Sequence, residues 1–184
     1  MKDAYYYTSS ADKVREVEHF FKPMVRLGIL KVPPPGLTEI LDTDLTQLIK
    51  AKAAAAYRAV QVPVVVEHGA FCFDYLKGLP GVLIRPFWRE MGGGLCALVP
   101  PGQSRKVTVR SAVCYCDGKD RKIILKEVEG ELPPCAQGTG GFHWDPIFIP
   151  KGETRTFAEM TLDEKLARSP SGLAYAELRK QFGF

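Results

Sequence analysis

The chain has 184 residues, with 25 lysines and arginines against 21 aspartates and glutamates, which gives a formal net charge of +4. Its hydrophobic content of 46% and aromatic content of 10% are typical of a globular protein and argue against disorder. The small positive charge does not indicate a nucleic-acid or membrane partner. No apolar run approaches the roughly 20 residues of a membrane helix, and the opening residues lack the apolar core of a signal peptide. We therefore expect one cytoplasmic domain over residues 1–184.

The cysteines agree with that location. Their number is odd, and none form a C-x-x-C pair with zinc-ligand spacing. We expect all five to be reduced and structural, as in most cytosolic proteins. They are Cys72, Cys96, Cys114, Cys116 and Cys135.

The first half of the chain reads as strand, helix, helix, strand. Residues 4–7 form a short apolar run that favours a buried strand. Hydroxyl residues then precede a helical pattern over 12–21. The spacing of apolar residues and a run of alanines predict a second helix over 45–58. Residues 64–66 are three valines, the best strand core in the sequence.

The second half adds two more strands and two more helices, and the order of elements along the whole chain predicts a mixed α/β protein. The glycine-containing segment 78–102 is expected to be rich in loops. Residues 107–116 alternate as a half-buried strand does, and 123–128 return as its hairpin partner. Two helix starts follow, a capping box at 161–164 and a Ser-Pro pair at 169–170.

A phosphate site is one interpretation of the segment between the first strand and the first helix. Thr8 and Ser10 supply hydroxyl groups, the helix start supplies free backbone N–H groups, and Lys13 lies in the first helical turn. The alternative is an ordinary helix cap with no ligand.

Three acidic residues, Glu39, Asp42 and Asp44, come just before the second helix. Their carboxylates could hold Mg²⁺, which prefers oxygen ligands, or they could simply complement the helix dipole. Lys52 lies on the apolar side of that helix, where a lysine must reach solvent or meet an anion.

Two further segments carry residues suited to ligand binding. Glu67 and His68 follow the valine run, and α/β folds place ligand groups at the ends of buried strands. The run Gly138-Thr139-Gly140-Gly141-Phe142-His143-Trp144-Asp145 leads a glycine-rich loop into aromatic residues and a carboxylate. Aromatic faces stack on nucleobases and a carboxylate accepts from a purine N–H, although a core aromatic cluster would have the same composition.

Together these segments resemble the inosine triphosphate pyrophosphatase family, the noncanonical purine NTP pyrophosphatases, along nearly the whole chain. Residues 67–81 are similar to the family's V-E-D-[ST]-G-L…G-L-P-G, and 141–148 to G-F-G-[YW]-D-P-I-F. The order of Phe157-Ala158-Glu159-Met160 and Glu164-Lys165 also matches. The opening Thr8…Lys13 matches T-G-N-x-x-K in part, and residues 37–40 resemble the segment with a metal-ligand Glu.

The resemblance implies an elongated α/β fold, with a mixed sheet, flanking helices and two lobes around a central nucleotide cleft. Family members are usually homodimers that cleave inosine, deoxyinosine or xanthosine triphosphate to the monophosphate and pyrophosphate with Mg²⁺. The motif positions assign the phosphates, the metal and the base to separate residues. Phosphates would contact Lys13, Lys52 and Arg85, Mg²⁺ would bind Glu39, and the base would lie near Phe142, Trp144, Asp145 and Lys165. Further contacts with the substrate are expected from Thr8, Ser10 and Ser169.

Three departures from the family's motifs fall in the site. His68 stands where the family has its catalytic Asp, and a neutral imidazole is a poor ligand for so hard a cation as Mg²⁺. The family's S-H-R-G, whose His and Arg contact the purine, reads Ser169-Pro170-Ser171-Gly172. The glycine of T-G-N is replaced by Ser9. Helix caps and apolar faces are retained, which favours a protein that folds as a pyrophosphatase but has lost or greatly weakened the hydrolysis.

Three functions follow as hypotheses. The first is a binding protein for an inosine-type triphosphate, a sensor or regulatory subunit of an effector protein with little turnover. The second is an active pyrophosphatase, in which His68 or Glu67 positions the water. Glu67 is the less suitable of the two because successive strand residues face opposite ways. The third is a structural partner that retains the dimer surface and does not use nucleotide.

Overall fold

The chain begins with a strand, a helix and a second strand that returns beside the first. The computed structural model describes residues 2–33 and 36–184. β1 (Ala4–Thr8) leads into α1 (Ala11–Phe20), and β2 (Leu27–Lys31) pairs parallel with β1, Tyr6 opposite Ile29. The sequence analysis missed β2. Its Gly28 lies against the ring of Tyr5, where an added Cβ would come within 2.6 Å of a ring atom.

The middle of the chain supplies the longest helix and the longest strands. α2 (Leu45–Val60) is followed by β3 (Val64–Phe73), which pairs parallel with β1. β5 (Lys106–Cys116) and β6 (Arg121–Glu131) follow, close to the predicted hairpin. The strand order of the sheet is β2-β1-β3-β5-β6-β7, and its mixture of parallel and antiparallel pairs confirms the predicted mixed α/β class.

Contacts group the chain into two units. The first contains the residues up to His68 together with Ser111–Leu125 and Leu173–Phe184. The second contains Gly69–Arg110 and Lys126–Gly172.

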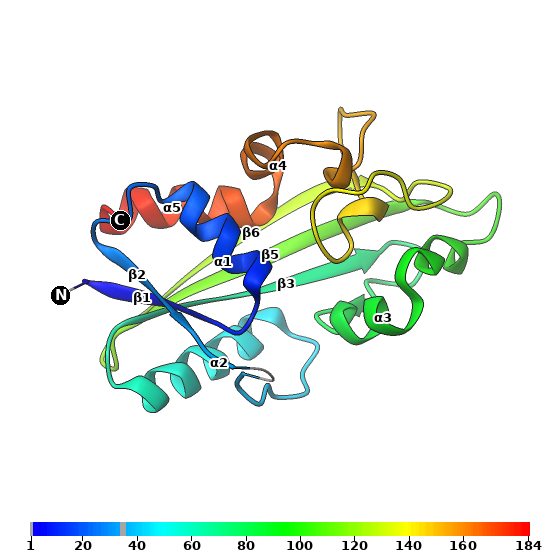
Figure 1. The fold of residues 1–184 in the computed structure, drawn as a ribbon. Coiled ribbons are helices and arrows are strands. Elements are labelled where there is room, and N and C mark those ends of the chain that lie inside the picture. Colours follow the sequence, from blue (N-terminus) through cyan, green and yellow to red (C-terminus); the bar gives the residue numbers. More distant parts are fainter. Residues whose placement is uncertain (1, 34–35) are drawn as a thin grey trace. The chain divides into compact units, whose positions relative to one another are not determined.

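In the first unit, helices cover both faces of the parallel strands. Figure 1 shows α1 and the C-terminal helix α5 (Pro170–Phe182) on one face of β1 and α2 on the other. α2 begins at Asp44, whose Oδ1 accepts from the backbone N–H groups of Thr46 and Gln47, and ends where Gln61 adopts a positive φ of 53°. Local capping therefore sets both ends of this helix.

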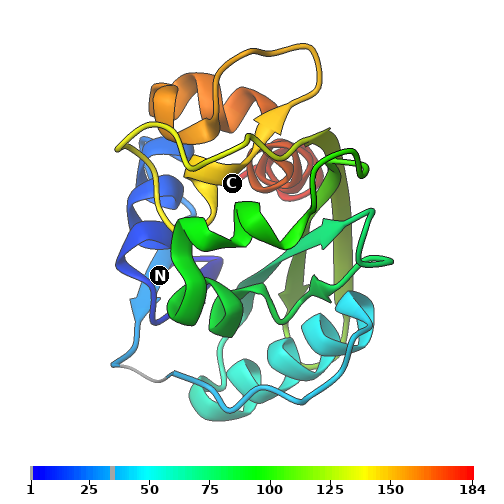
Figure 2. The same cartoon turned by 90° about the vertical axis from the view of Figure 1, so that its right-hand side faces the viewer.

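The second unit is built around an aromatic core. Phe71, Phe73, Phe148 and Phe157 are fully buried there, and α3 (Ile84–Met91) packs Ile84 against them. Figure 2 draws α3 and the adjoining 3-10 helix η1 (Gly92–Leu98) toward the viewer. The remaining elements are short and are joined by loops. They are β4 (Pro80–Gly81), η2 (Asp145–Ile147), β7 (Ile149–Pro150), η3 (Phe157–Glu159) and α4 (Leu162–Arg168).

Two expectations about local structure are wrong. Residues 78–102 were expected to be loop-rich, yet they contain α3 and η1, because buried Ile84, Leu95 and Cys96 anchor both helices in the core. The strand that begins at Val64 continues to Phe73, since buried Ala70, Phe71 and Phe73 extend it beyond the valine run. Glu67 and His68 thus lie within a strand and not at its end.

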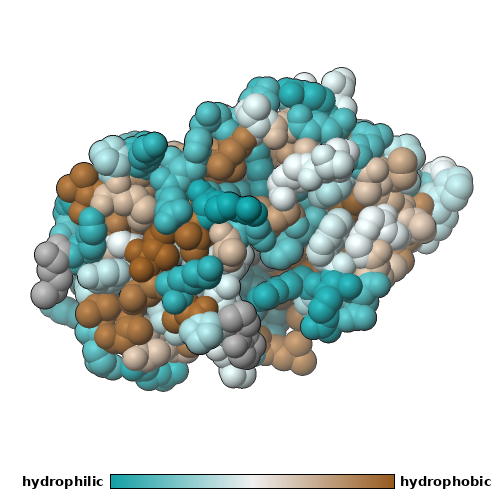
Figure 3. Space-filling view, in the orientation of Figure 1, coloured by the Kyte–Doolittle hydropathy of each residue, from teal (hydrophilic) through white to brown (hydrophobic). Residues whose placement is uncertain are grey.

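The surface of the first unit carries scattered apolar side chains. Figure 3 shows hydrophobic residues interrupted by hydrophilic ones over this unit. Val25 follows α1, Leu41 precedes α2 and Leu125 lies in β6, so these exposed side chains come from separate segments. All five cysteines are free thiols, as predicted. Within the described residues, no helix combines the length and apolarity needed to cross a membrane.

Candidate functional site

The hydroxyl groups after β1 have local structural roles. Ser10 is the N-cap of α1, and its Oγ accepts from the backbone N–H of Lys13 at 3.3 Å. The Oγ1 of Thr8 accepts from the backbone N–H of Ser10 at 3.1 Å. Both contacts fit the helix-cap interpretation. Phosphate contacts from Thr8 and Ser10 stay a prediction.

Lys13 projects from the first turn of α1 and forms an ion pair with Glu67 of β3. The Glu67 side chain is 4% exposed, whereas the Lys13 side chain is 19% exposed. Lys13 is therefore paired with a buried carboxylate, while its own side chain is partly accessible to solvent. A lysine in that position can exchange part of its contact for an incoming anion.

Glu67 and His68 contact different partners, as alternation along a strand requires. Glu67 contacts Lys13, the hydroxyl of Tyr6 at 3.4 Å and the hydroxyl of Ser111 at 2.9 Å. His68 instead has its Nδ1 3.5 Å from Oε1 of Glu39. The two neighbouring side chains therefore do not share one reacting point. Their catalytic roles remain predictions.

Glu39 is the centre of a second charged cluster in the first unit. Its Oε1 accepts from Nζ of Lys52 at 2.6 Å as well as lying near His68. Lys52 also donates to the backbone carbonyl of Glu67 at 3.1 Å. Burial would raise the pKa of Glu39, but hydrogen bonding to His68 and the positive charge of Lys52 outweigh it and hold the pKa well below 4.5.

The carboxylates of Glu39 and Glu67 are not arranged to bind the predicted Mg²⁺ ion. Glu39 is already occupied by a lysine ammonium and an imidazole, and both oxygens of Glu67 have protein partners. Among the described residues, no group of three or more His, Cys, Asp or Glu side chains is placed to hold a metal ion. Asp42 accepts from the backbone of Asp44, and Asp44 caps α2, so both acids serve the start of the helix.

In the second unit, Asp145 and Lys165 form a sealed pair beside Phe142. Nζ of Lys165 is 2.6 Å from Oδ2 of Asp145, and the two side chains are 6% and 2% exposed. The same Oδ2 accepts from the backbone N–H of Phe142 at 2.7 Å, and Nζ lies 4.0 Å from the centre of the Phe142 ring. The sequence predicted all three for base recognition, and the structure brings these three together.

The other residues predicted to contact substrate in the second unit lie elsewhere or have structural contacts. The Trp144 ring packs edge-on against Phe71 at 5.5 Å, so it belongs with the core aromatics. Ser169 is buried, and its Oγ accepts from the backbone N–H of Gly172 at 3.1 Å, which caps the start of α5. Arg85 is exposed in the first turn of α3.

The sequence analysis did not identify Tyr6, Ser111 and Tyr175, whose hydroxyl groups extend the hydrogen-bonded group around Glu67. Tyr6 and Tyr175 are fully buried, with their hydroxyl oxygens 3.0 Å apart. A tyrosine in a buried strand needs a partner for its hydroxyl, so the run Tyr5-Tyr6-Tyr7 carried a signal. The sequence around Ser111 gave no comparable signal, because its partner, Glu67, is distant in sequence.

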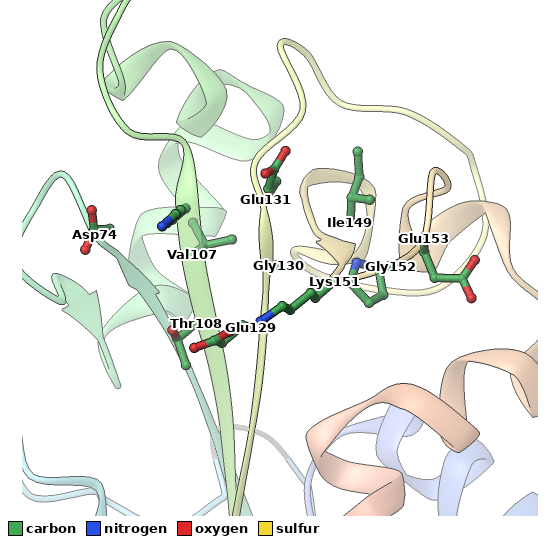
Figure 4. Close-up of a pocket in the computed structure, with 12 residues that line it drawn as sticks. Asp74, Val107, Thr108, Glu129, Gly130, Glu131, Ile149, Lys151, Gly152 and Glu153 are labelled. Carbon is green, nitrogen blue, oxygen red and sulfur yellow. Dashed lines mark hydrogen bonds and ion pairs between the residues drawn. The ribbon is translucent and has the colours of Figure 1, made fainter.

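A cavity of about 450 Å³ opens on the second unit near the end of β6. Its lining includes Asp74, Lys106, Glu129, Lys151 and Glu153. Figure 4 shows Lys151 and Glu129 directed toward each other, with Nζ and Oε2 2.9 Å apart. No residue predicted from sequence lines this cavity.

Comparison with known proteins gives one consistent answer. A family model described as the Ham1 family matches residues 4–181. The dITP/XTP pyrophosphatase of Thermococcus kodakarensis is 35% identical over 172 residues, which cover 92% of this chain and 91% of that protein. The inosine triphosphate pyrophosphatase of Yarrowia lipolytica is 35% identical over 175 residues, covering 94% and 91%.

Solved structures agree at the level of the fold. A HAM1 protein from Coxiella burnetii superimposes with a TM-score of 0.83 at 19% identity, over 100% of this chain and 99% of that one. A nucleoside-triphosphatase / dITP/XTP pyrophosphatase from Mycobacterium abscessus gives 0.71 at 22% identity, over 95% and 98%. The architecture is therefore the one that these proteins share.

Proposed function

Because this chain belongs to the Ham1 family, we propose that it binds a noncanonical purine nucleoside triphosphate of the dITP, XTP or ITP kind and hydrolyses it weakly. In this proposal Lys13 and Lys52 bind the phosphates, and Phe142 and Lys165 form part of the base-binding site. The names of the relatives support the ligand class. In this proposal the protein acts as a homodimeric nucleotide sensor or as the regulatory subunit of an effector protein.

The proposal that hydrolysis is weak rests on one observation, the residue at position 68. His68 stands where the family motif has Asp, and with Lys52 it surrounds Oε1 of Glu39. An aspartate there would add a second negative charge beside Glu39, which is the charge pattern that attracts a divalent cation. Histidine reverses that pattern, because the carboxylate now faces two nitrogen donors. Electrostatic stabilisation of the reacting phosphates is lowered accordingly.

The alternative is an active pyrophosphatase, and the names of the relatives favour it. In that mechanism His68 would act as a general base. Its Nδ1 is 3.5 Å from Glu39, a contact that can orient the imidazole. The third hypothesis, a structural partner that uses no nucleotide, predicts that neither lysine affects ligand binding.

The test is equilibrium dialysis against dITP with Mg²⁺, followed by chromatography of all recovered nucleotide, for the wild type and His68→Asp. We expect the wild type to retain intact triphosphate and His68→Asp to release monophosphate and pyrophosphate. The gain should be about 100-fold, the lower end of what a positioned acid or base contributes. Rapid hydrolysis by the wild type that falls in His68→Asp would establish the alternative. No retention by either protein would contradict both.

A further inference from the structure

Behind the ion pair of Lys13 and Glu67 lies a chain of buried hydroxyl groups. Ser111 donates to Oε1 of Glu67 at 2.9 Å, and Tyr6 donates to Oε2 at 3.4 Å. The hydroxyl of Tyr175 lies 3.0 Å from that of Tyr6. These donors come from β5, β1 and α5, three separate elements of the first unit.

We propose that Glu67 is a positioning residue, which holds the Lys13 ammonium group for a triphosphate, and that Ser111 and Tyr6 fix its carboxylate from the buried side. This inference rests on the proposed function, because it takes Lys13 as a phosphate ligand. It differs from the sequence-based expectation that Glu67 positions the attacking water.

Burial and hydrogen bonding favour the positioning role. The Glu67 side chain is 4% exposed, and each of its oxygens has a protein partner, so water or metal has little access to it. Burial raises the pKa of Tyr6 above its ordinary value of 10.0, so that its hydroxyl stays protonated and can donate. Ser111 thus holds Oε1 of the carboxylate, while the Tyr6 hydroxyl and the Lys13 ammonium group share Oε2.

A fixed carboxylate limits the freedom of the Lys13 side chain. A lysine has several rotatable bonds and loses rotamer entropy when a ligand immobilises it. An ammonium group that is already held in place loses less on binding, which is the usual benefit of preorganisation. The Lys13 side chain is 19% exposed, so the pair can be approached from solvent along this side chain.

Glu67 could instead merely neutralise Lys13, and the two roles predict opposite results. A purely neutralising carboxylate competes with the ligand, so Glu67→Gln would strengthen binding of a polyanion. A positioning carboxylate orients the ammonium group, so Glu67→Gln would weaken binding. Glu67→Asp keeps the charge but shortens the side chain, and should recover part of the affinity if orientation matters.

The experiment measures calorimetric affinity for inorganic triphosphate in the full chain. Lys13→Met, Glu67→Gln, Ser111→Ala and Tyr6→Phe are compared with the wild type. Tyr7→Phe is the matched control, because it removes the same hydroxyl from the next residue of β1, which faces the other side of the strand. Thermal unfolding of each variant separates loss of fold from loss of affinity.

We expect Glu67→Gln and Ser111→Ala each to weaken binding by about tenfold, the effect of losing one charge-assisted hydrogen bond. Tyr6→Phe should weaken it less, about threefold, because its hydrogen bond is longer. Tyr7→Phe should bind as the wild type does. In a double-mutant cycle, the effect of Tyr6→Phe should vanish when Lys13 is already Met.

The outcomes separate the two proposals. If Lys13→Met binds triphosphate normally, the phosphate role in the proposed function is wrong. If Lys13→Met weakens binding but Tyr6→Phe and Ser111→Ala do not, only the positioning inference is overturned. Tighter binding by Glu67→Gln would also overturn it. An effect of Tyr6→Phe that persists in the Lys13→Met background would indicate a merely structural tyrosine.

Discussion

The two units each contain a buried carboxylate paired with a lysine, but the pairs differ in how much the lysine is exposed. Lys165 is sealed against Asp145 with 6% of its side chain exposed, and Asp145 also holds the backbone of Phe142. Lys13 is 19% exposed beside Glu67, which is held by side-chain hydroxyl groups. The sealed pair fixes a loop, whereas the open pair presents a charge. The exposure of the lysine, more than the presence of a pair, therefore distinguishes a lysine that shapes its surroundings from one that can meet an anion directly.

The largest effect is expected from breaking the sealed pair. Lys165→Met leaves the Asp145 carboxylate buried without its cation, so the free energy of unfolding should fall by about 3 kcal/mol. Lys13→Met should cost about 1 kcal/mol, since its pair is partly solvated. Urea unfolding of both variants measures the difference. Equal losses would show that exposure does not distinguish the pairs.

A smaller effect of opposite sign is expected in the loop that Asp145 holds. His143 has a positive φ of 50°, a conformation that costs most side chains about 1 kcal/mol and glycine little. His143→Gly should therefore raise the free energy of unfolding by about 0.5 kcal/mol, after the greater freedom of glycine in the unfolded chain is counted. Gln61→Gly, at φ 53° beyond α2, is the matched control in the first unit. A loss of stability in His143→Gly alone would mean that the imidazole makes contacts worth more than the strain.

An effect of similar size concerns the acid dependence of the Glu39 cluster. The pKa of Glu39 is depressed in the folded protein, so the folded state binds fewer protons at this group than the unfolded state does. Its contribution is present above pH 4.5 and is lost as the pH falls below that value toward the folded pKa. Glu39→Gln should lower the free energy of unfolding by about 0.5 kcal/mol at neutral pH, with the difference from wild type shrinking in acid.

Urea unfolding at several pH values between neutral and about 3 tests this expectation. Glu129→Gln is the control, because Glu129 also pairs with a lysine, Lys151, but both side chains are largely exposed. Salt should remove any effect of that exposed pair. A pH-independent gap between wild type and Glu39→Gln would contradict the assigned role of the Glu39 carboxylate.

Sequence patterns correctly predicted the helices and strands that neighbouring residues are sufficient to specify. The alternation over 107–116 and the capping box at Thr161 and Glu164 identify β5 and α4 because neighbouring residues suffice to form them. β2 was missed because an edge strand of five residues depends on pairing with β1. α3 was missed because its helix is stabilised by the aromatic core around Ile84, which no local pattern reveals.

The proximity of candidate site residues was predictable where motif positions retain their residues. Phe142, Asp145 and Lys165 are together as expected, since the segment with Phe142 and Asp145 was recognisable as a whole. The contacts of Glu67 with Ser111 and Tyr6 join three strands, and long-range pairing of that kind cannot be inferred from one sequence. The same limit applies to Glu39, whose acceptance of both Lys52 and His68 depends on where its loop lies.

The pleat of β3 has a consequence for how this protein can change over generations. Glu67 and His68 are neighbours whose contacts are separate, so residue 68 can be replaced without disturbing the hydroxyl groups around residue 67. Histidine and aspartate codons differ in their first base alone. A single base change can therefore convert His68 to the aspartate of the family motif. Because side chains alternate along the strand, this exchange leaves the contacts of Glu67 in place.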